Sequence, residues 1–219
     1  MAGKCCQDRS LTSAESRHGG NLPPARRYAR RVNRLILLNG LPGVGKSTIA
    51  RRYATDHPGT LLCDVDVLRT FIGGWRDDFE DAGARIRPAA LGMITGYLRE
   101  SGDVVLPQLL ARASELEKFE RAALDAGAEF IEVMLEADTD DAVRRFHRRD
   151  DGADPWHPIV RSLVAEAGGD DVLRDYAVRL HGLVARRPRT KTVPSVADAV
   201  DATYAAVLSA IGDVTTTAR

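Results

Sequence analysis

The sequence has little of what marks secreted, membrane-spanning or metal-scaffolded proteins. Its 219 residues include only three cysteines, Cys5, Cys6 and Cys63. Because their number is odd and their spacing does not suit a metal, a disulfide scaffold or a zinc module is excluded. No apolar run reaches the ~18 residues of a transmembrane helix, and the N-terminus lacks the apolar segment of a signal peptide. We therefore expect a cytoplasmic protein without a membrane partner.

The chain also lacks a net charge, with 31 Lys and Arg against 31 Asp and Glu. Residues 1–34 nevertheless hold eight basic and two acidic residues, so the remainder is acidic. A surface that follows DNA phosphates is usually built into the fold, so an acidic body argues against a dedicated DNA-binding domain. We interpret residues 1–33 as a disordered basic leader or as the result of a misassigned translation start. The domain is predicted at residues 34–213.

From Arg34 onward, short apolar runs alternate with longer helical patterns. The run at 35–38 is wholly apolar, as expected for a parallel strand that is covered on both faces. Further strands are predicted at 60–63, 104–106, 129–135 and 191–193, and helices at 46–53, 65–72, 89–100, 114–126, 139–149, 159–167, 171–185 and 196–211. This alternation is typical of βαβ units, so we predict an α/β fold with a five-stranded parallel sheet.

The strongest motif lies between the first strand and the first helix. It satisfies G-x-x-x-x-G-K-[ST] in the strand–loop–helix context that the motif requires. Glycines let the backbone wrap around phosphates and direct N–H groups at them, and the helix N-terminus adds positive partial charge. Lys46 can reach the β- and γ-phosphates, and the Ser47 hydroxyl can bind Mg²⁺. The predicted ATP site consists of Gly40, Leu41, Pro42, Gly43, Val44, Gly45, Lys46, Ser47 and Thr48.

Two carboxylates follow the second predicted strand. Asp64 and Asp66 stand at its carboxyl end, where ligands of open parallel sheets bind. A carboxylate there can accept the proton of an attacking hydroxyl, and Arg69 can hold an anionic group. We predict Asp66 as the catalytic base and Asp64 and Arg69 as substrate contacts. Either Asp could instead cap the helix that begins near Val65, and one residue could do both.

These residues resemble the P-loop kinases that phosphorylate small molecules or nucleic-acid ends. Residues 40–72 look most like the kinase part of bacteriophage polynucleotide kinase, with the same G-x-P-G-x-G-K-S-T loop, the Pro58-Gly59 break and an Asp-x-x-Arg at the same distance. The run from Asp64 is similar to adenylylsulfate kinase, and an Asp after the second strand is shared with chloramphenicol phosphotransferase and the zeta toxins. The resemblance implies a three-layer α/β/α kinase fold in which Asp66 is the general base.

The resemblance also implies a lid after the fourth strand, whose arginines close over the phosphates. Residues 144–158 match this lid, with Arg145 and Arg149 one helical turn apart. These arginines are predicted to stabilise charge on the transferred phosphoryl group. Alternatively, they form a solvated helix end, where cations favourably meet the C-terminal dipole.

The chain departs from this family at the third strand. P-loop enzymes commonly carry an Asp at the end of that strand, but Pro107 and Gln108 stand there in this sequence, and Asp103 precedes the strand at its other end. We interpret Gln108 as either a substrate contact or an ordinary strand-end residue. Trp75 and Trp156 fall in segments that flank the predicted acceptor site, as an aromatic wall or as part of the core.

Together these features predict a kinase that transfers the γ-phosphate of MgATP to a hydroxyl of a small molecule or a nucleic-acid end. The acidic body offers no obvious groove for a strand, which favours a small acceptor. The alternative is a regulatory ATPase or switch without an acceptor, which the missing third-strand Asp supports. A non-catalytic interaction module, the third possibility, would bind no nucleotide.

Overall fold

The computed structural model describes residues 31–149 and 154–213. The predicted leader over residues 1–33 lies almost entirely outside the described residues, as do residues 150–153 of the predicted lid. Within the described ranges, no helix is long and apolar enough to cross a membrane.

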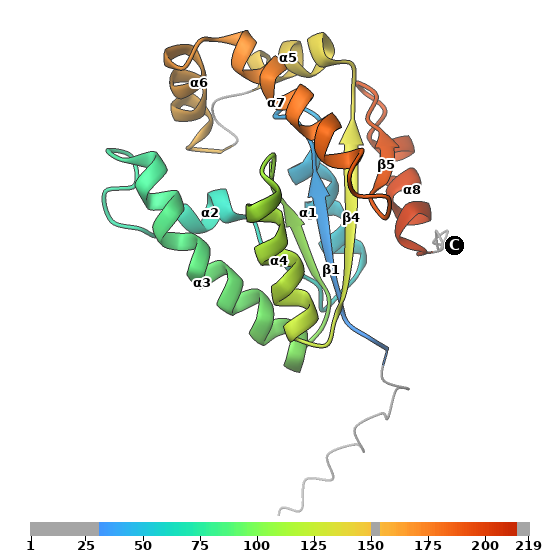
Figure 1. Ribbon diagram of the computed structural model, residues 1–219. Coiled ribbons are helices and arrows are strands. Elements are labelled where there is room, and N and C mark those ends of the chain that lie inside the picture. Colours follow the sequence, from blue (N-terminus) through green and yellow to red (C-terminus); the bar gives the residue numbers. More distant parts are fainter. Residues whose placement is uncertain (1–30, 150–153, 214–219) are drawn as a thin grey trace, which may run out of the picture. The chain divides into compact units, whose positions relative to one another are not determined.

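A sheet of five parallel strands forms the centre of the described chain. The strand order is β2-β3-β1-β4-β5, so the strand that precedes the glycine-rich loop lies in the middle (Figure 1). Pairing is parallel throughout, which confirms the predicted sheet. The strands are β1 (Arg34–Asn39), β2 (Leu61–Leu62), β3 (Val104–Pro107), β4 (Glu129–Glu136) and β5 (Lys191–Pro194).

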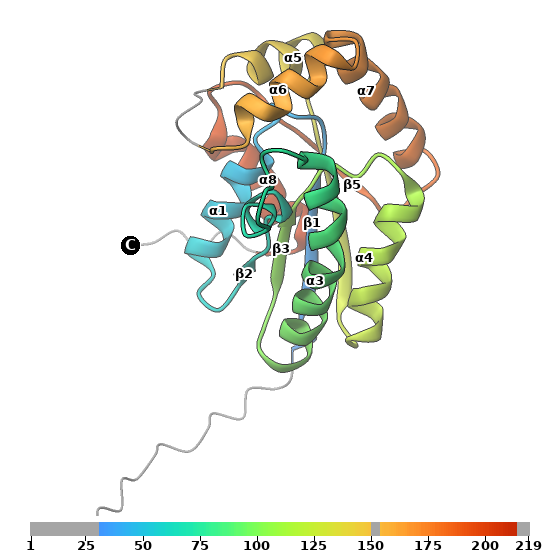
Figure 2. The same cartoon turned by 90° about the vertical axis from the view of Figure 1, so that its left-hand side faces the viewer.

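Helices cover both faces of the sheet. Side chains of β1 point alternately to one face and the other, and both sets are apolar, so each face needs a covering layer. Leu35 and Leu37 pack with α3 and α4, whereas Ile36 and Leu38 pack with α1 and α8. The three layers are visible in Figures 1 and 2. The helices are α1 (Lys46–Asp56), α2 (Val65–Arg69), α3 (Phe79–Glu100), α4 (Ala113–Asp125), α5 (Thr139–His147), α6 (His157–Glu166), α7 (Asp170–Val184) and α8 (Val200–Ile211).

Most helices begin within two residues of the predicted start, but α3 and α8 begin further away. α3 starts at Phe79 rather than at residue 89, because the Asp78 side chain accepts a hydrogen bond from the Asp81 N–H and caps the helix. Pro88 is accommodated inside this helix. α8 starts at Val200 rather than at residue 196, because Asp198 has a left-handed φ of 57° that interrupts a helix.

A buried ionic cluster joins the amino-terminal ends of β1 and β3. Arg34 is 6% exposed and lies 2.8 Å from a carboxylate oxygen of Asp103 and 2.8 Å from one of Asp213. It also donates a hydrogen bond to the Tyr53 hydroxyl of α1. Asp103 therefore lies at the end of β3 away from the glycine-rich loop, as predicted from the sequence. The opposite, carboxyl end of the sheet is left for α5, α6 and α7, toward which the strand arrows point in Figure 1.

Candidate active site

The glycine-rich loop turns sharply from β1 into α1, in close contact with its neighbours. Gly40 has a φ of 141°, and a Cβ there would lie 2.5 Å from the Leu135 carbonyl oxygen. Gly43 has a φ of 94°, and its Cβ would lie 2.4 Å from the Ala142 carbonyl oxygen. Glycine is thus required at both positions. Gly45 is the N-cap of α1, so the loop leads into the positive end of the helix dipole.

The Lys46 side chain is folded back on this loop. It is 8% exposed, and its Nζ donates hydrogen bonds to the carbonyl oxygens of Gly40 and Leu41, both at 2.8 Å. Burial, together with the positive charge of Arg149, lowers the pKa of Lys46 to about 7. A bound phosphate would supply the negative charge that favours the ammonium form.

Ser47 and Asp64 meet beside the start of α1. The Ser47 hydroxyl donates to Asp64 Oδ2 at 3.3 Å, and Asp64 is 5% exposed. Its other oxygen caps α2 by accepting from the Asp66 N–H, and burial with the nearby charge of Asp66 raises the pKa of Asp64. A hydroxyl and a carboxyl oxygen are ligands that Mg²⁺ prefers, so the pair fits an ion that arrives with a nucleotide. No group of three or more His, Cys, Asp or Glu residues forms a metal site in the part of the chain that the structure describes.

Asp66 stands on the first turn of α2, where Arg69 holds it. Arg69 Nη2 lies 3.3 Å from Asp66 Oδ1, and the Asp66 side chain remains 32% exposed. Arg69 is 7% exposed, and its Cζ lies 3.7 Å from the centroid of the Phe79 ring. A Cβ on Gly83 would lie 2.6 Å from Arg69 Nη2, so the small residue makes room for the guanidinium. This packing orients Asp66 while leaving it accessible.

β3 brings Gln108 to the carboxyl end of β1. The Gln108 N–H donates to the Leu38 carbonyl at 3.1 Å, and its side-chain Oε1 is buried without a hydrogen-bond partner among the described residues. Asn39, which the sequence analysis does not identify, holds this region together. Its Oδ1 accepts from the N–H groups of Gly40 and Leu110, and its Nδ2 donates to the Leu110 carbonyl. The one feature of the sequence that could have identified Asn39 is its position, as a single amide side chain directly after an apolar run.

The two predicted lid arginines have different surroundings. Arg145 forms an ion pair with Asp141 at 2.9 Å and donates hydrogen bonds to the Ser195 hydroxyl and carbonyl. Arg149 lies 3.2 Å from His157 Nε2 and is close enough to lower the pKa of Lys46. Burial lowers the pKa of Arg149 itself. Of the two, Arg149 is the one whose charge lowers the pKa of Lys46, and both arginines line the hollow beside the start of α1.

Ser195 is a second residue that the sequence analysis misses. Its hydroxyl donates to the Val44 carbonyl at 2.8 Å, which ties the segment after β5 to the glycine-rich loop. A cavity of about 360 Å³ opens here, between the start of α1, the end of α5 and the segment before α8. Its walls include Thr48, Arg149 and Asp198. The position, next to the loop, suits the remainder of a nucleotide.

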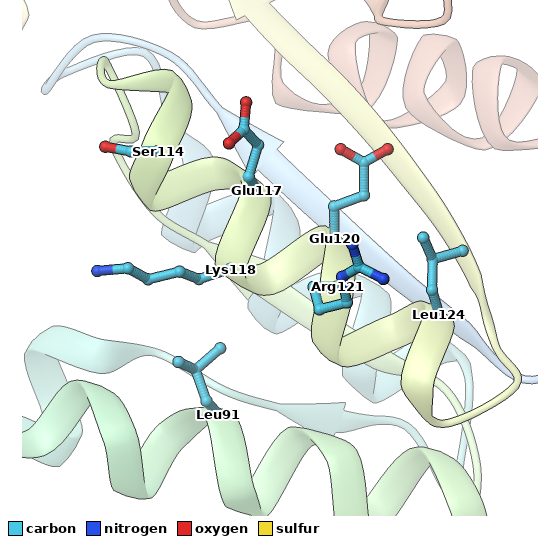
Figure 3. Close-up of a pocket in the computed structure, with 7 residues that line it drawn as sticks. All are labelled: Leu91, Ser114, Glu117, Lys118, Glu120, Arg121 and Leu124. Atoms are coloured by element: carbon cyan, nitrogen blue, oxygen red, sulfur yellow. The ribbon is translucent and has the colours of Figure 1, made fainter.

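A larger hollow of about 600 Å³ lies between α3 and α4, on another part of the molecule (Figure 3). Leu91 of α3 and side chains of α4 line it, among them Lys118 and Leu124. It contains none of the predicted site residues.

Comparison with known proteins agrees with this geometry. The family described as AAA domain matches residues 35–162, which include all of β1 but its first residue, the glycine-rich loop, α2 and both predicted lid arginines. Among curated proteins, an adenylate kinase from Deinococcus radiodurans is 30% identical over 115 residues. That match covers 48% of this chain and 51% of the relative, so the chain spans about half the length of the curated relative that it matches.

Solved structures share the fold. A gluconokinase from Sinorhizobium meliloti has a TM-score of 0.57 and 19% identity, over 84% of this chain and 94% of the other. The tunicamycin resistance protein of D. radiodurans has a TM-score of 0.58 and 16% identity, over 83% and 97% of the two chains. The chain therefore belongs to the AAA domain family and shares its fold with these solved structures.

Proposed function

We propose that this protein is a kinase that transfers the γ-phosphoryl group of MgATP to a hydroxyl group of an acceptor. The observation that carries the proposal is the pairing of Asp66 with Arg69 beside a complete phosphate-binding loop. An accessible carboxylate that another side chain orients is the group that an attacking alcohol requires. The negative charge of Asp66 also acts on Lys46, where it partly opposes the effect of burial on the lysine pKa, as expected if both groups belong to one reaction centre.

ATP binding is proposed to begin at the loop. The triphosphate takes the place of the carbonyl oxygens that now accept from Lys46, and the ammonium then contacts the β- and γ-phosphates. Arg149, which lines the cavity beside the loop, adds a second positive charge. Bound by the Ser47 hydroxyl and the Asp64 carboxylate, Mg²⁺ would neutralise further charge on the phosphates.

Transfer then depends on Asp66. As the acceptor oxygen attacks the γ-phosphorus, its proton passes to an Asp66 carboxylate oxygen, the bond to the β-phosphate oxygen breaks, and ADP leaves. Arg69 keeps that carboxylate in place through the 3.3 Å ion pair. Lys46 and Arg149 stabilise the charge on the transferred group. Most of the rate enhancement therefore comes from positioning and electrostatics.

The family relationship supports a small-molecule acceptor. The curated relative is an adenylate kinase, and a structural neighbour is a gluconokinase. A 5′-hydroxyl nucleic-acid end is the other acceptor that the residues of the loop and α2 support.

One observation favours a regulatory ATPase or switch instead. Gln108 stands where P-loop enzymes commonly place an acidic residue, and a neutral amide cannot balance the charge of Mg²⁺. The two functions are separated by ADP release from MgATP, measured with and without a panel of hydroxyl-bearing acceptors. A kinase responds to one class of acceptor, whereas a switch turns over ATP at the same rate without any.

A further inference from the structure

We infer that Asp154 is a positioning residue, which holds Arg149 beside the glycine-rich loop through His157 and ties both to α1. The inference rests on the proposed function, because it takes Arg149 as the group that meets the γ-phosphate. Asp154 precedes α6 by three residues and is 8% exposed.

The Asp154 carboxylate is shared by two helices. Its Oδ1 accepts a hydrogen bond from Arg51 Nη2 of α1 at 2.8 Å, and its Oδ2 lies 3.5 Å from His157 Nε2. The backbone carbonyl of Asp154 also accepts from the His157 N–H, at 3.1 Å. Because a buried carboxylate without partners is costly, these contacts link the start of α6 to α1.

Arg149 is held by α6 at two points. Its Nη1 donates a hydrogen bond to His157 Nε2 at 3.2 Å, and a guanidinium can only donate, so the ring nitrogen accepts. Arg161, one turn further along α6, donates from Nη1 to the Arg149 backbone carbonyl at 3.1 Å. The position of Arg149 therefore follows that of α6.

Apolar packing makes the start of α6 a firm support. Trp156, directly before the helix, is 6% exposed and packs with Trp75 and Phe79. Ile159 and Val160 of α6 pack against the same cluster. The two tryptophans are thus part of a core and not an aromatic wall, and α6 is fixed by this core on one side and by Asp154 on the other.

The Asp154 charge also acts on Arg149. Burial lowers the pKa of Arg149, and among the carboxylates that oppose this effect Asp154 comes first, ahead of Asp66 and Asp64. Since the Arg149 charge in turn acts on Lys46, the interactions that begin at α1 return to it. Asp154 keeps a cation beside the loop before a nucleotide supplies its own negative charge.

A double-mutant cycle between Asp154 and Arg149 tests the inference. Asp154→Asn keeps the size of the side chain and removes its charge, and should lower kcat by about 10–100-fold with at most about a threefold change in the KM for ATP. In Arg149→Ala protein the same substitution should lower kcat by less than about twofold, because Asp154 acts through Arg149. Asp154→Glu, which keeps the charge, should recover part of the loss.

Two further variants separate this role from folding. Asp201 pairs with Arg52, the next residue of α1, at the surface, so Asp201→Asn is a matched control that should leave kcat unchanged. Arg51 has a side chain that is 46% exposed, so Arg51→Gln should fold normally and still lower kcat by about threefold or more. It provides the test even if Asp154→Asn does not fold.

A binding measurement needs no acceptor. The full chain would be titrated with MgADP, alone and with beryllium fluoride, which occupies the place of the γ-phosphate. Asp154→Asn should weaken binding of the fluoride complex by about tenfold and that of MgADP alone by less than about twofold. Equal weakening of both, or an equal loss of kcat with and without Arg149, would overturn the inference. ATP turnover that no acceptor stimulates, with this binding difference intact, would overturn the proposed kinase and leave the role of Asp154 standing.

Discussion

Lys46 is the residue whose charge should change most when a nucleotide binds. Its burial lowers its pKa to about 7 from an ordinary value of 10.5, so much of the free protein holds a neutral amine at pH 8. Phosphates favour the ammonium and should return the pKa toward its ordinary value. MgATP binding at pH 8 should therefore take up nearly one proton, measured as a calorimetric heat that varies with the ionisation enthalpy of the buffer.

Lys46→Met is the matched control for this measurement. It removes the titrating group, so the heat of MgATP binding to this variant should be the same in every buffer. The free energy of MgATP binding should become less favourable by roughly 2 kcal/mol. A wild-type heat of binding that does not depend on the buffer would contradict the lowered pKa of Lys46.

Single residues differ in how far the sequence reveals them. The residues of the glycine-rich loop were predictable because phosphate binding dictates both their types and their spacing. Asn39 and Ser195 were not, because they act on partners 71 and 151 residues away in the sequence. No local pattern encodes such a contact. The assignments of Asp66, Arg69 and Gln108 remain predictions that the geometry supports.

At the scale of an element, Arg145 lies within α5 and Arg149 lies two residues beyond its end, although the sequence predicts the same role for both. Arg149 acts electrostatically on Lys46, whereas Arg145 is bonded to Asp141 and Ser195. Arg149→Ala should therefore lower kcat by about 10²–10³-fold with little change in thermal stability. Arg145→Ala should reduce the free energy of unfolding by roughly 1–2 kcal/mol, because it removes several partly buried polar contacts.

Steady-state kinetics and urea unfolding of the two variants would test this division. Equal losses of kcat without loss of stability would show that both arginines act on the phosphates.

The element boundaries themselves were predictable where apolar periodicity is strong, as in β1 and α4. The predicted starts were furthest from the structure at α3 and α8, where a single capping carboxylate and a single left-handed residue decide the start.

At the scale of the whole molecule, the cluster around Arg34 ties together β1, α1 and Asp213, which lies two residues after the end of α8. Burial opposes the ionisation of Asp213, but hydrogen bonds from Arg34 and Tyr53 outweigh it and lower the pKa of this carboxyl below 3.8. Its stabilising effect is therefore present above pH 3.8 and is lost as the pH falls through the lower, folded-state pKa. Asp213→Asn should cost about 2 kcal/mol of unfolding free energy at pH 7 and less at acid pH.

Asp171→Asn provides a control for this substitution, because Asp171 is exposed and forms an ion pair with Arg174 at the surface. Its loss should lower the free energy of unfolding by at most about 0.5 kcal/mol. Urea unfolding between pH 3 and pH 7 would measure both. A difference in the free energy of unfolding between wild type and Asp213→Asn that stays constant over this pH range would contradict the lowered pKa of Asp213.

The fold as a whole was predictable, because the alternation of apolar runs and helices leaves a parallel sheet as the consistent arrangement.

The central claim is that Asp66 activates an acceptor hydroxyl, and ADP release from MgATP tests it most directly. Wild type, Asp66→Asn and the Asp171→Asn control would be compared with and without nucleosides, sugars and 5′-hydroxyl oligonucleotides. We predict that one acceptor class stimulates the wild type and the control, and that Asp66→Asn lowers this rate by about 10²–10⁴-fold while still binding MgATP. Turnover that is independent of every acceptor and equal in wild type and Asp66→Asn would contradict the account and indicate an ATPase or switch.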